Sequence, residues 1–170
     1  MLQPDNANPS PSVKSLLALA VVAAGLALIV WLYLGGAAID VTAERSVLIA
    51  AIWNHVGWGV VATPALVAYA AWRVLTATPP ATRTEHLSRL LLWALAAMIV
   101  FLAVTGPVTV WTYGRPMKVF DWFAIASPTG NMPGLHSLAE NAHVQVSHFA
   151  PWLAGAEAAL FGWIKLWNKV

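Results

Sequence analysis

Residues 47–75 read VLIAAIWNHVGWGVVATPALVAYAAWRVL, an almost wholly apolar run that nevertheless contains a histidine, His55. The run is longer than the ~20 residues that cross about 30 Å of hydrocarbon at 1.5 Å per residue. Three further apolar runs of sufficient length lie near 16–34, 87–110 and 139–167. Because an imidazole is costly inside a bilayer, a histidine in such a run indicates a functional site.

The composition supports the same class of protein along the whole chain. Of 170 residues, 59% are hydrophobic and only 9% are charged, whereas a soluble domain carries roughly 25% charged residues. We therefore predict an all-α integral membrane four-helix bundle that forms one domain over residues 15–170. Its spans are expected at 15–36, 47–76, 86–112 and 139–167. Residues 1–14 are expected to form a flexible cytoplasmic tail.

Charge and cysteine content exclude several classes of function. A net charge of +2 without a Lys/Arg cluster excludes nucleic-acid binding. The absence of cysteine excludes disulfides, thiolate metal sites, iron–sulfur clusters and covalently attached haem. Gly36-Ala37-Ala38 resembles a signal-peptide cleavage site, but the preceding apolar run of about 19 residues exceeds the 7–15 of a signal peptide. We therefore interpret this run as a span.

The distribution of Lys and Arg predicts the orientation, because cytoplasmic loops retain these residues. With the N-terminus inside, the cytoplasmic side holds six cations: Lys14, Arg73, Arg83, Arg89, Lys165 and Lys169. The outer side holds three: Arg45, Arg115 and Lys118. Both termini are therefore expected in the cytoplasm.

The longest connection, residues 113–138, falls on the outer side. It contains its own apolar run, and a connection of this length without structure would be unusual. We predict a short interfacial helix around 119–123 that caps the outer end of the bundle.

Two histidines lie at similar depth on different predicted spans. His55 has Gly59 one helical turn away, where the missing side chain would let a flat ring approach the backbone. His143 opens the fourth span on the same outer side. The simplest shared partner is a haem iron held from both faces. The alternatives are a hydrogen bond from His55 to a neighbouring carbonyl and an interfacial position for His143.

The other polar residues of the fourth span raise separate questions. His148 is a rival to His143, five residues deeper and about 140° round the helix. Glu157 lies about 21 Å beyond His143 and within 40° of the same face. Since no cationic neighbour is evident, its carboxyl is expected to be neutral and hydrogen-bonded. His86 and His136 are expected in exposed loops.

The sequence resembles the bacterial cytochrome b561 family, whose four-helix members bind haem b. The resemblance is clearest from Thr105-Gly106-Pro107 through Tyr113-Gly114-Arg115-Pro116 and on to His143. A second similar segment runs from Arg45 through His55-Val56-Gly57-Trp58-Gly59 to Arg73, and together the two cover about half of the chain.

The resemblance implies one haem b on the outer side, with His55 and His143 as axial ligands of the iron. Members of the family carry a second, inner haem, but here the first span has no histidine and the remaining ligand position holds Glu157. The family also implies a bacterial inner membrane. Arg115 and Lys118 lie just outside the haem and are expected to pair with its propionates, although ordinary interfacial charge explains them equally well.

One haem with two axial histidines predicts an electron-transfer cytochrome rather than a stand-alone catalyst. It would exchange electrons between an outer-side partner and either quinone in the bilayer or a partner subunit. A second hypothesis is a haem-free accessory or anchor subunit of a membrane complex that keeps the same scaffold. A weaker third is a proton or ion pathway through Glu157 and His148.

Overall fold

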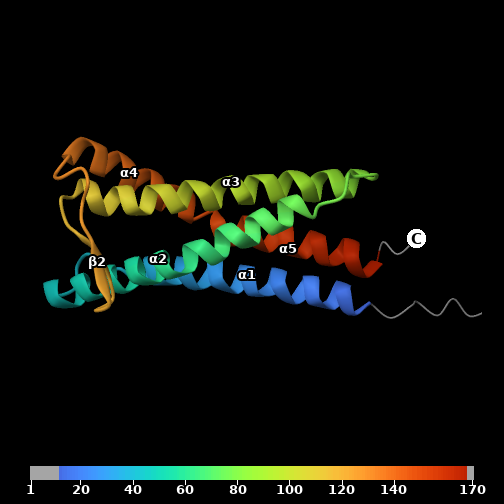
Figure 1. Ribbon diagram of the computed structural model, residues 1–170, viewed down its shortest axis with the longest axis horizontal. Helices are drawn as coiled ribbons and strands as arrows, with labels where there is room; N and C mark the ends of the chain where they lie inside the picture. The colour runs from blue at the N-terminus through green and yellow to red at the C-terminus, as the bar shows by residue number, and fades with distance from the viewer. Residues whose placement is uncertain (1–11, 168–170) are drawn as a thin grey trace, which may run out of the picture.

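The computed structural model describes residues 12–167, which form five α-helices and one β-hairpin. In chain order the elements are α1 (Val13–Ala37), α2 (Arg45–Leu75), α3 (Arg83–Thr112), β1 (Met117–Val119), β2 (Phe123–Ile125), α4 (Pro133–Ser147) and α5 (Ala150–Trp167). The helices lie side by side along the long axis (Figure 1). One end, which we call the terminal end, holds the start of α1, the α2–α3 connection and the end of α5. The opposite, hairpin end holds the α1–α2 connection and the two strands.

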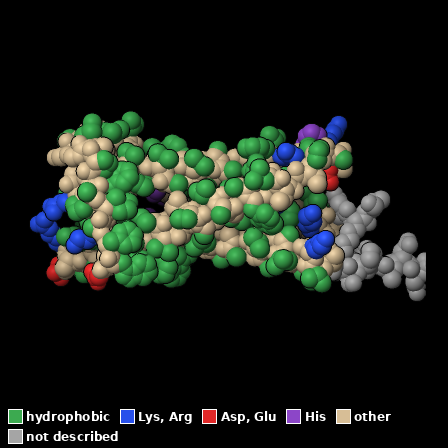
Figure 2. Space-filling view, in the orientation of Figure 1, with side chains coloured by type: hydrophobic (Ala, Val, Ile, Leu, Met, Phe, Trp, Pro, Cys, Tyr) green, Lys and Arg blue, Asp and Glu red, His purple; other side chains and the backbone are tan. Residues whose placement is uncertain are grey.

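Three helices, α1, α2 and α3, are long and apolar enough to cross a membrane. Large apolar side chains on these helices face outward, among them Leu17 at 66% and Val104 at 58% exposure. Figure 2 shows hydrophobic side chains along the length of the molecule, with Lys and Arg near its two ends. This distribution is typical of a protein whose middle is covered by lipid.

The packing of the helices leaves α2 diagonally opposite the last part of the chain. Helix α2 packs against α1 and α3, and α5 also packs against α1 and α3, while α4 packs mainly along α3. Side chains that point inward from α2 therefore face α4 and α5 across the interior.

The hydrophobic core lies in the middle and towards the terminal end. It includes Val22 of α1, Tyr69 of α2, Leu95 of α3 and Phe161 of α5, all at most 9% exposed. A Cβ built on Gly25 would lie 3.0 Å from Cζ of Tyr69, so the tyrosine ring packs directly on the backbone of α1. Every long helix contributes to this core.

The helix bounds differ from the predicted spans mainly in the last part of the chain. Helix α1 begins at Val13, and residues 1–11 of the predicted tail lie outside the described residues. The region predicted as one span, 139–167, is divided between α4 and α5, with a break at His148 and Phe149. Pro151 lies in the first turn of α5, where its missing N–H removes no helical hydrogen bond.

The predicted interfacial helix around 119–123 is wrong, because this segment forms a hairpin. Met117, Lys118 and Val119 are buried, exposed and buried in turn, which is the period of a strand rather than of a helix. Val119 pairs with Phe123, and Phe120 between them has a φ of 50°. This left-handed conformation at Phe120 turns the chain back on itself.

The hairpin is held against α2 by an aromatic contact. A Cβ built on Gly57 would lie only 2.9 Å from Cε1 of Phe120, so the ring rests on bare backbone. The same ring meets Trp58 edge-on, with centroids 5.4 Å apart.

We therefore expect Gly57→Ala to loosen the hairpin, because the added methyl group overlaps the Phe120 ring at a cost of about 1–3 kcal/mol. Trypsin should then cleave after the exposed Lys118 several-fold faster than in the wild-type protein in detergent. Gly59→Ala is the matched control, since its Cβ meets nothing within 4 Å. Equal cleavage rates in the two variants would contradict the proposed contact.

Candidate functional site

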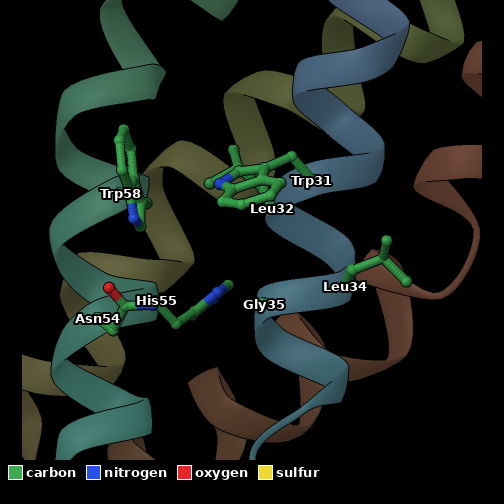
Figure 3. Close-up of a pocket in the computed structure, with 7 residues that line it drawn as sticks. All are labelled: Trp31, Leu32, Leu34, Gly35, Asn54, His55 and Trp58. Carbon is green, nitrogen blue, oxygen red and sulfur yellow. The ribbon is translucent and has the colours of Figure 1, made fainter.

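His55 projects from α2 towards α1 near the hairpin end. Figure 3 shows its ring directed at the backbone of α1 around Gly35. A Cβ built on Gly36 would lie 3.1 Å from Cε1 of His55. Any side chain at position 36 would therefore press on the imidazole, and the glycine leaves it room.

A pocket of about 260 Å³ opens beside this imidazole. It is lined by Trp31, Leu32, Leu34, Gly35, Asn54, His55 and Trp58 (Figure 3). Trp31 and Trp58 meet edge-on, with centroids 6.2 Å apart. Nδ1 of His55 is buried and has no hydrogen-bond partner among the described residues. Since almost all buried polar atoms in proteins are hydrogen-bonded, an unpaired nitrogen beside a pocket is typical of a binding site.

The hydrogen bonds of Thr105 determine the tautomer of His143. The Thr105 hydroxyl donates to the Phe101 carbonyl, 2.9 Å away, and its oxygen lies 2.9 Å from Nδ1 of His143. A hydroxyl has one proton, which the carbonyl already accepts, so Nδ1–H must donate to Thr105. Nε2 of His143 therefore carries a free lone pair, the form in which histidine binds a metal.

The two imidazoles lie at the same end of the molecule, on helices that face one another across the interior. His55 comes from α2 and His143 from α4, and they lie close enough for the charge on one to act on the other. His143 also packs on bare backbone, since a Cβ built on Gly106 of α3 would lie 3.3 Å from its Cε1. Each imidazole of the pair thus lies against a glycine of a flanking helix.

The other histidines have different partners. His148, the rival to His143, is exposed at the α4–α5 break and donates from Nδ1 to the Val144 carbonyl at 2.7 Å. His136 lies in α4 rather than in a loop, and its Nδ1 donates to the Thr109 carbonyl at 2.9 Å. His86 is exposed, in the first turn of α3.

The remaining predicted site residues have fewer contacts. Gly59 has open space where a Cβ would lie. Arg115 and Lys118 are exposed at the hairpin end, and neither forms an ion pair within residues 12–167.

The residues that sequence reasoning missed are those that position the two imidazoles. Thr105 and Gly106 lie in the segment that resembles the cytochrome family, but neither was expected to contact His143. Gly36 drew attention only as part of an apparent cleavage site. The paired glycines 35 and 36 at the end of an apolar span were the available signal, because such pairs permit close approach to a helix.

The expectation that Glu157 has no cationic neighbour is wrong. Arg73 of α2 donates to Oε1 of Glu157, and both side chains are buried. Arg73 lies eighty-four residues earlier in the chain, so the partner could not be recognised from local sequence.

Chemically, the pair of imidazoles can supply two nitrogen ligands to one metal centre. Within the described chain, no group of three or more His, Cys, Asp or Glu side chains lies close enough to hold a metal ion. Two protein ligands suit a metal whose other positions are filled by a cofactor's own ring.

Comparison with known proteins identifies no family for this chain. No protein-family model, no curated protein and no solved structure matches it. The resemblance to bacterial cytochrome b561 therefore stays a prediction.

We expect ¹⁵N NMR of histidine-labelled protein to find His143 protonated at Nδ1 and unprotonated at Nε2. Thr105→Val removes the acceptor for Nδ1–H and should convert this signal into a mixture of tautomers. Thr105→Ser keeps the hydroxyl and should preserve the wild-type spectrum. An Nε2-protonated His143 in the wild-type protein would contradict the assigned hydrogen bond.

Proposed function

We propose that the chain is a membrane-bound b-type cytochrome with one haem b between His55 and His143. It would transfer electrons between a partner at the hairpin end and either quinone or a partner subunit. The observation that carries this proposal is the juxtaposition of two imidazoles with available nitrogens. One has a free lone pair at Nε2 because Thr105 holds its Nδ1–H. The other has no hydrogen bond to a described residue that fixes its ring, and its buried Nδ1 lies beside Gly35 of α1.

The surrounding residues fit a flat apolar cofactor. Trp31, Leu32 and Trp58 provide apolar walls for the pocket beside His55, while Gly36 and Gly106 leave room for the two imidazoles themselves. Haem b supplies an iron that accepts and releases one electron. The chain's own contribution is to hold both imidazoles, with Thr105 orienting His143 through its second nitrogen, as hydrogen-bonded partners of metal ligands do.

The same proposal includes a four-helix bundle that crosses the bacterial inner membrane. Helices α4 and α5 together would form the fourth crossing. The described cations at the terminal end are Lys14, Arg83, Arg89 and Lys165, while Arg73 is buried against Glu157. Arg45, Arg115 and Lys118 lie at the hairpin end. The excess of cations favours a cytoplasmic terminal end, which would put the histidine pair on the periplasmic side.

If His55 and His143 both held the iron, the haem would supply one-electron transfer rather than substrate binding at the metal. A cofactor near one end of a span of about 30 Å would serve partners on that side or within the bilayer. Arg115 and Lys118, exposed at this end, would be available to the propionates.

The first test is the optical spectrum of protein purified from haem-replete cells. We expect about one b-type haem per chain in the reduced-minus-oxidised spectrum. His55→Ala and His143→Ala each remove a nitrogen ligand and should lose most of the haem. His148→Ala and His136→Ala should retain it, because their imidazoles bond to carbonyls elsewhere.

Well-folded wild-type protein without a Soret band would contradict the cytochrome and favour the accessory subunit. Loss of haem in His148→Ala but not in His143→Ala would instead assign the rival ligand.

The second test concerns orientation and uses the absence of cysteine from the chain. A cysteine introduced at Val41, which is exposed at the hairpin end, should react with a membrane-impermeant maleimide in spheroplasts. A cysteine at Thr78, exposed at the terminal end, should react only after lysis. The reverse pattern would contradict the proposed topology, and the unsubstituted protein measures the background.

A further inference from the structure

A buried ion pair crosses the interior in the half of the molecule away from the histidine pair. Arg73 and Glu157 have side chains that are 6% and 0% exposed. Cζ of Arg73 also lies 3.8 Å from the centroid of the Phe161 ring. The hydroxyl-bearing ring of Tyr69 is close enough for both charges to act on it. These four residues, Tyr69, Arg73, Glu157 and Phe161, form what we call the ion-pair cluster.

The ion-pair cluster lies on the same diagonal as the histidine pair. Helix α2 supplies both His55 and Arg73, and the opposite segment supplies His143 from α4 and Glu157 from α5. Arg73 follows His55 by eighteen residues, which is five turns of an ideal helix and about 27 Å along its axis. On an ideal helix the two side chains would leave the same face, one in each half of the molecule, although Pro64 lies between them in α2.

The two halves differ in how their interiors are filled. Around the ion-pair cluster, Tyr69 packs on Gly25, and Val22, Leu95 and Ala154 are at most 2% exposed. Beside His55 there is a pocket of about 260 Å³ that reaches a buried imidazole nitrogen without a partner among the described residues. The terminal half has a pocket of about 190 Å³ between α2 and α3, but only small and aliphatic side chains line it, and neither Arg73 nor Glu157 is among them. Nε of Arg73 and Oε2 of Glu157 also have no partner among the described residues. A flat cofactor in the terminal half would have to displace a packed aromatic ring and separate a buried ion pair. Separating it would leave an uncompensated charge in an apolar interior.

We propose that the ion-pair cluster excludes a cofactor from the terminal half and holds α2 against α5 in its place. Cofactor chemistry is thereby restricted to the histidine pair. The claim about the terminal half does not depend on the haem proposed at the other site, because it concerns only residues that already fill the interior.

A double-mutant cycle tests the cluster in the full-length protein in detergent. Arg73→Met and Glu157→Leu should each lower the melting temperature on the order of 10 °C, since each leaves one buried charge unpaired. The double variant Arg73→Met/Glu157→Leu should recover most of this loss, because neither charge remains. Losses that simply add in the double variant would overturn the proposal.

Lys165→Met is the matched control. Its ammonium lies 5.6 Å from the centroid of the same Phe161 ring but forms no ion pair with an acidic side chain among residues 12–167. The melting temperature of the Lys165→Met variant should differ from that of the wild-type protein by about 2 °C or less. If neither single variant accumulates, the double variant decides: near wild-type accumulation supports the proposal, and its failure to accumulate overturns it.

Haem content gives an independent readout. The haem-to-protein ratio of the double variant should equal that of the wild-type protein, and more than one haem per wild-type chain would overturn the exclusion. A wild-type protein without haem would contradict the proposed function, whereas a failed mutant cycle would contradict only the ion-pair cluster. The two failures are therefore distinguishable.

Discussion

The structure depends on a constraint that acts on polar side chains between apolar helices, where each must find its partner inside the protein. In this chain the polar side chains concerned come from α2 and from the α4–α5 segment, which lies diagonally opposite α2. In the terminal half, Arg73 and Glu157 partner one another through one oxygen of the carboxylate, while Nε of Arg73 and Oε2 of Glu157 have no partner among the described residues. In the hairpin half, Thr105 bonds only one of the two ring nitrogens of His143, Nδ1. Nδ1 of His55 has no partner among the described residues. The proposed cofactor would use the nitrogens that remain available in the hairpin half.

The position of His143 follows from the way α3 ends. Exposed carbonyls at a helix C-terminus need donors, and here the following segment provides them. The Trp111 carbonyl accepts from the Ser127 hydroxyl at 2.7 Å, the Thr112 carbonyl accepts from the backbone N–H of Met132 at 2.8 Å, and the Thr109 carbonyl accepts from His136. These bonds hold the start of α4 along α3, which brings His143 to Thr105. The hairpin closes the same end by resting Phe120 on Gly57.

The sequence predicted the features that depend on overall composition and on residues that are energetically costly to bury among apolar helices. Apolar length predicted the long helices, and the cost of burying an imidazole singled out His55 and His143, which are both partly buried towards the hairpin end. The hairpin was missed because an apolar run such as 119–123 suits a helix or a strand equally, and the left-handed φ of Phe120 depends on packing against α2. The partner of Glu157 and the glycines beside the imidazoles were missed because they depend on which helices become neighbours.

Electron paramagnetic resonance observes directly the coordination of the iron that we propose between His55 and His143. In the oxidised purified protein at low temperature, two axial imidazoles from His55 and His143 predict a low-spin ferric haem signal from a single species. A high-spin ferric signal, which indicates an open or weakly held axial position, would contradict this coordination, as would the absence of any haem iron signal.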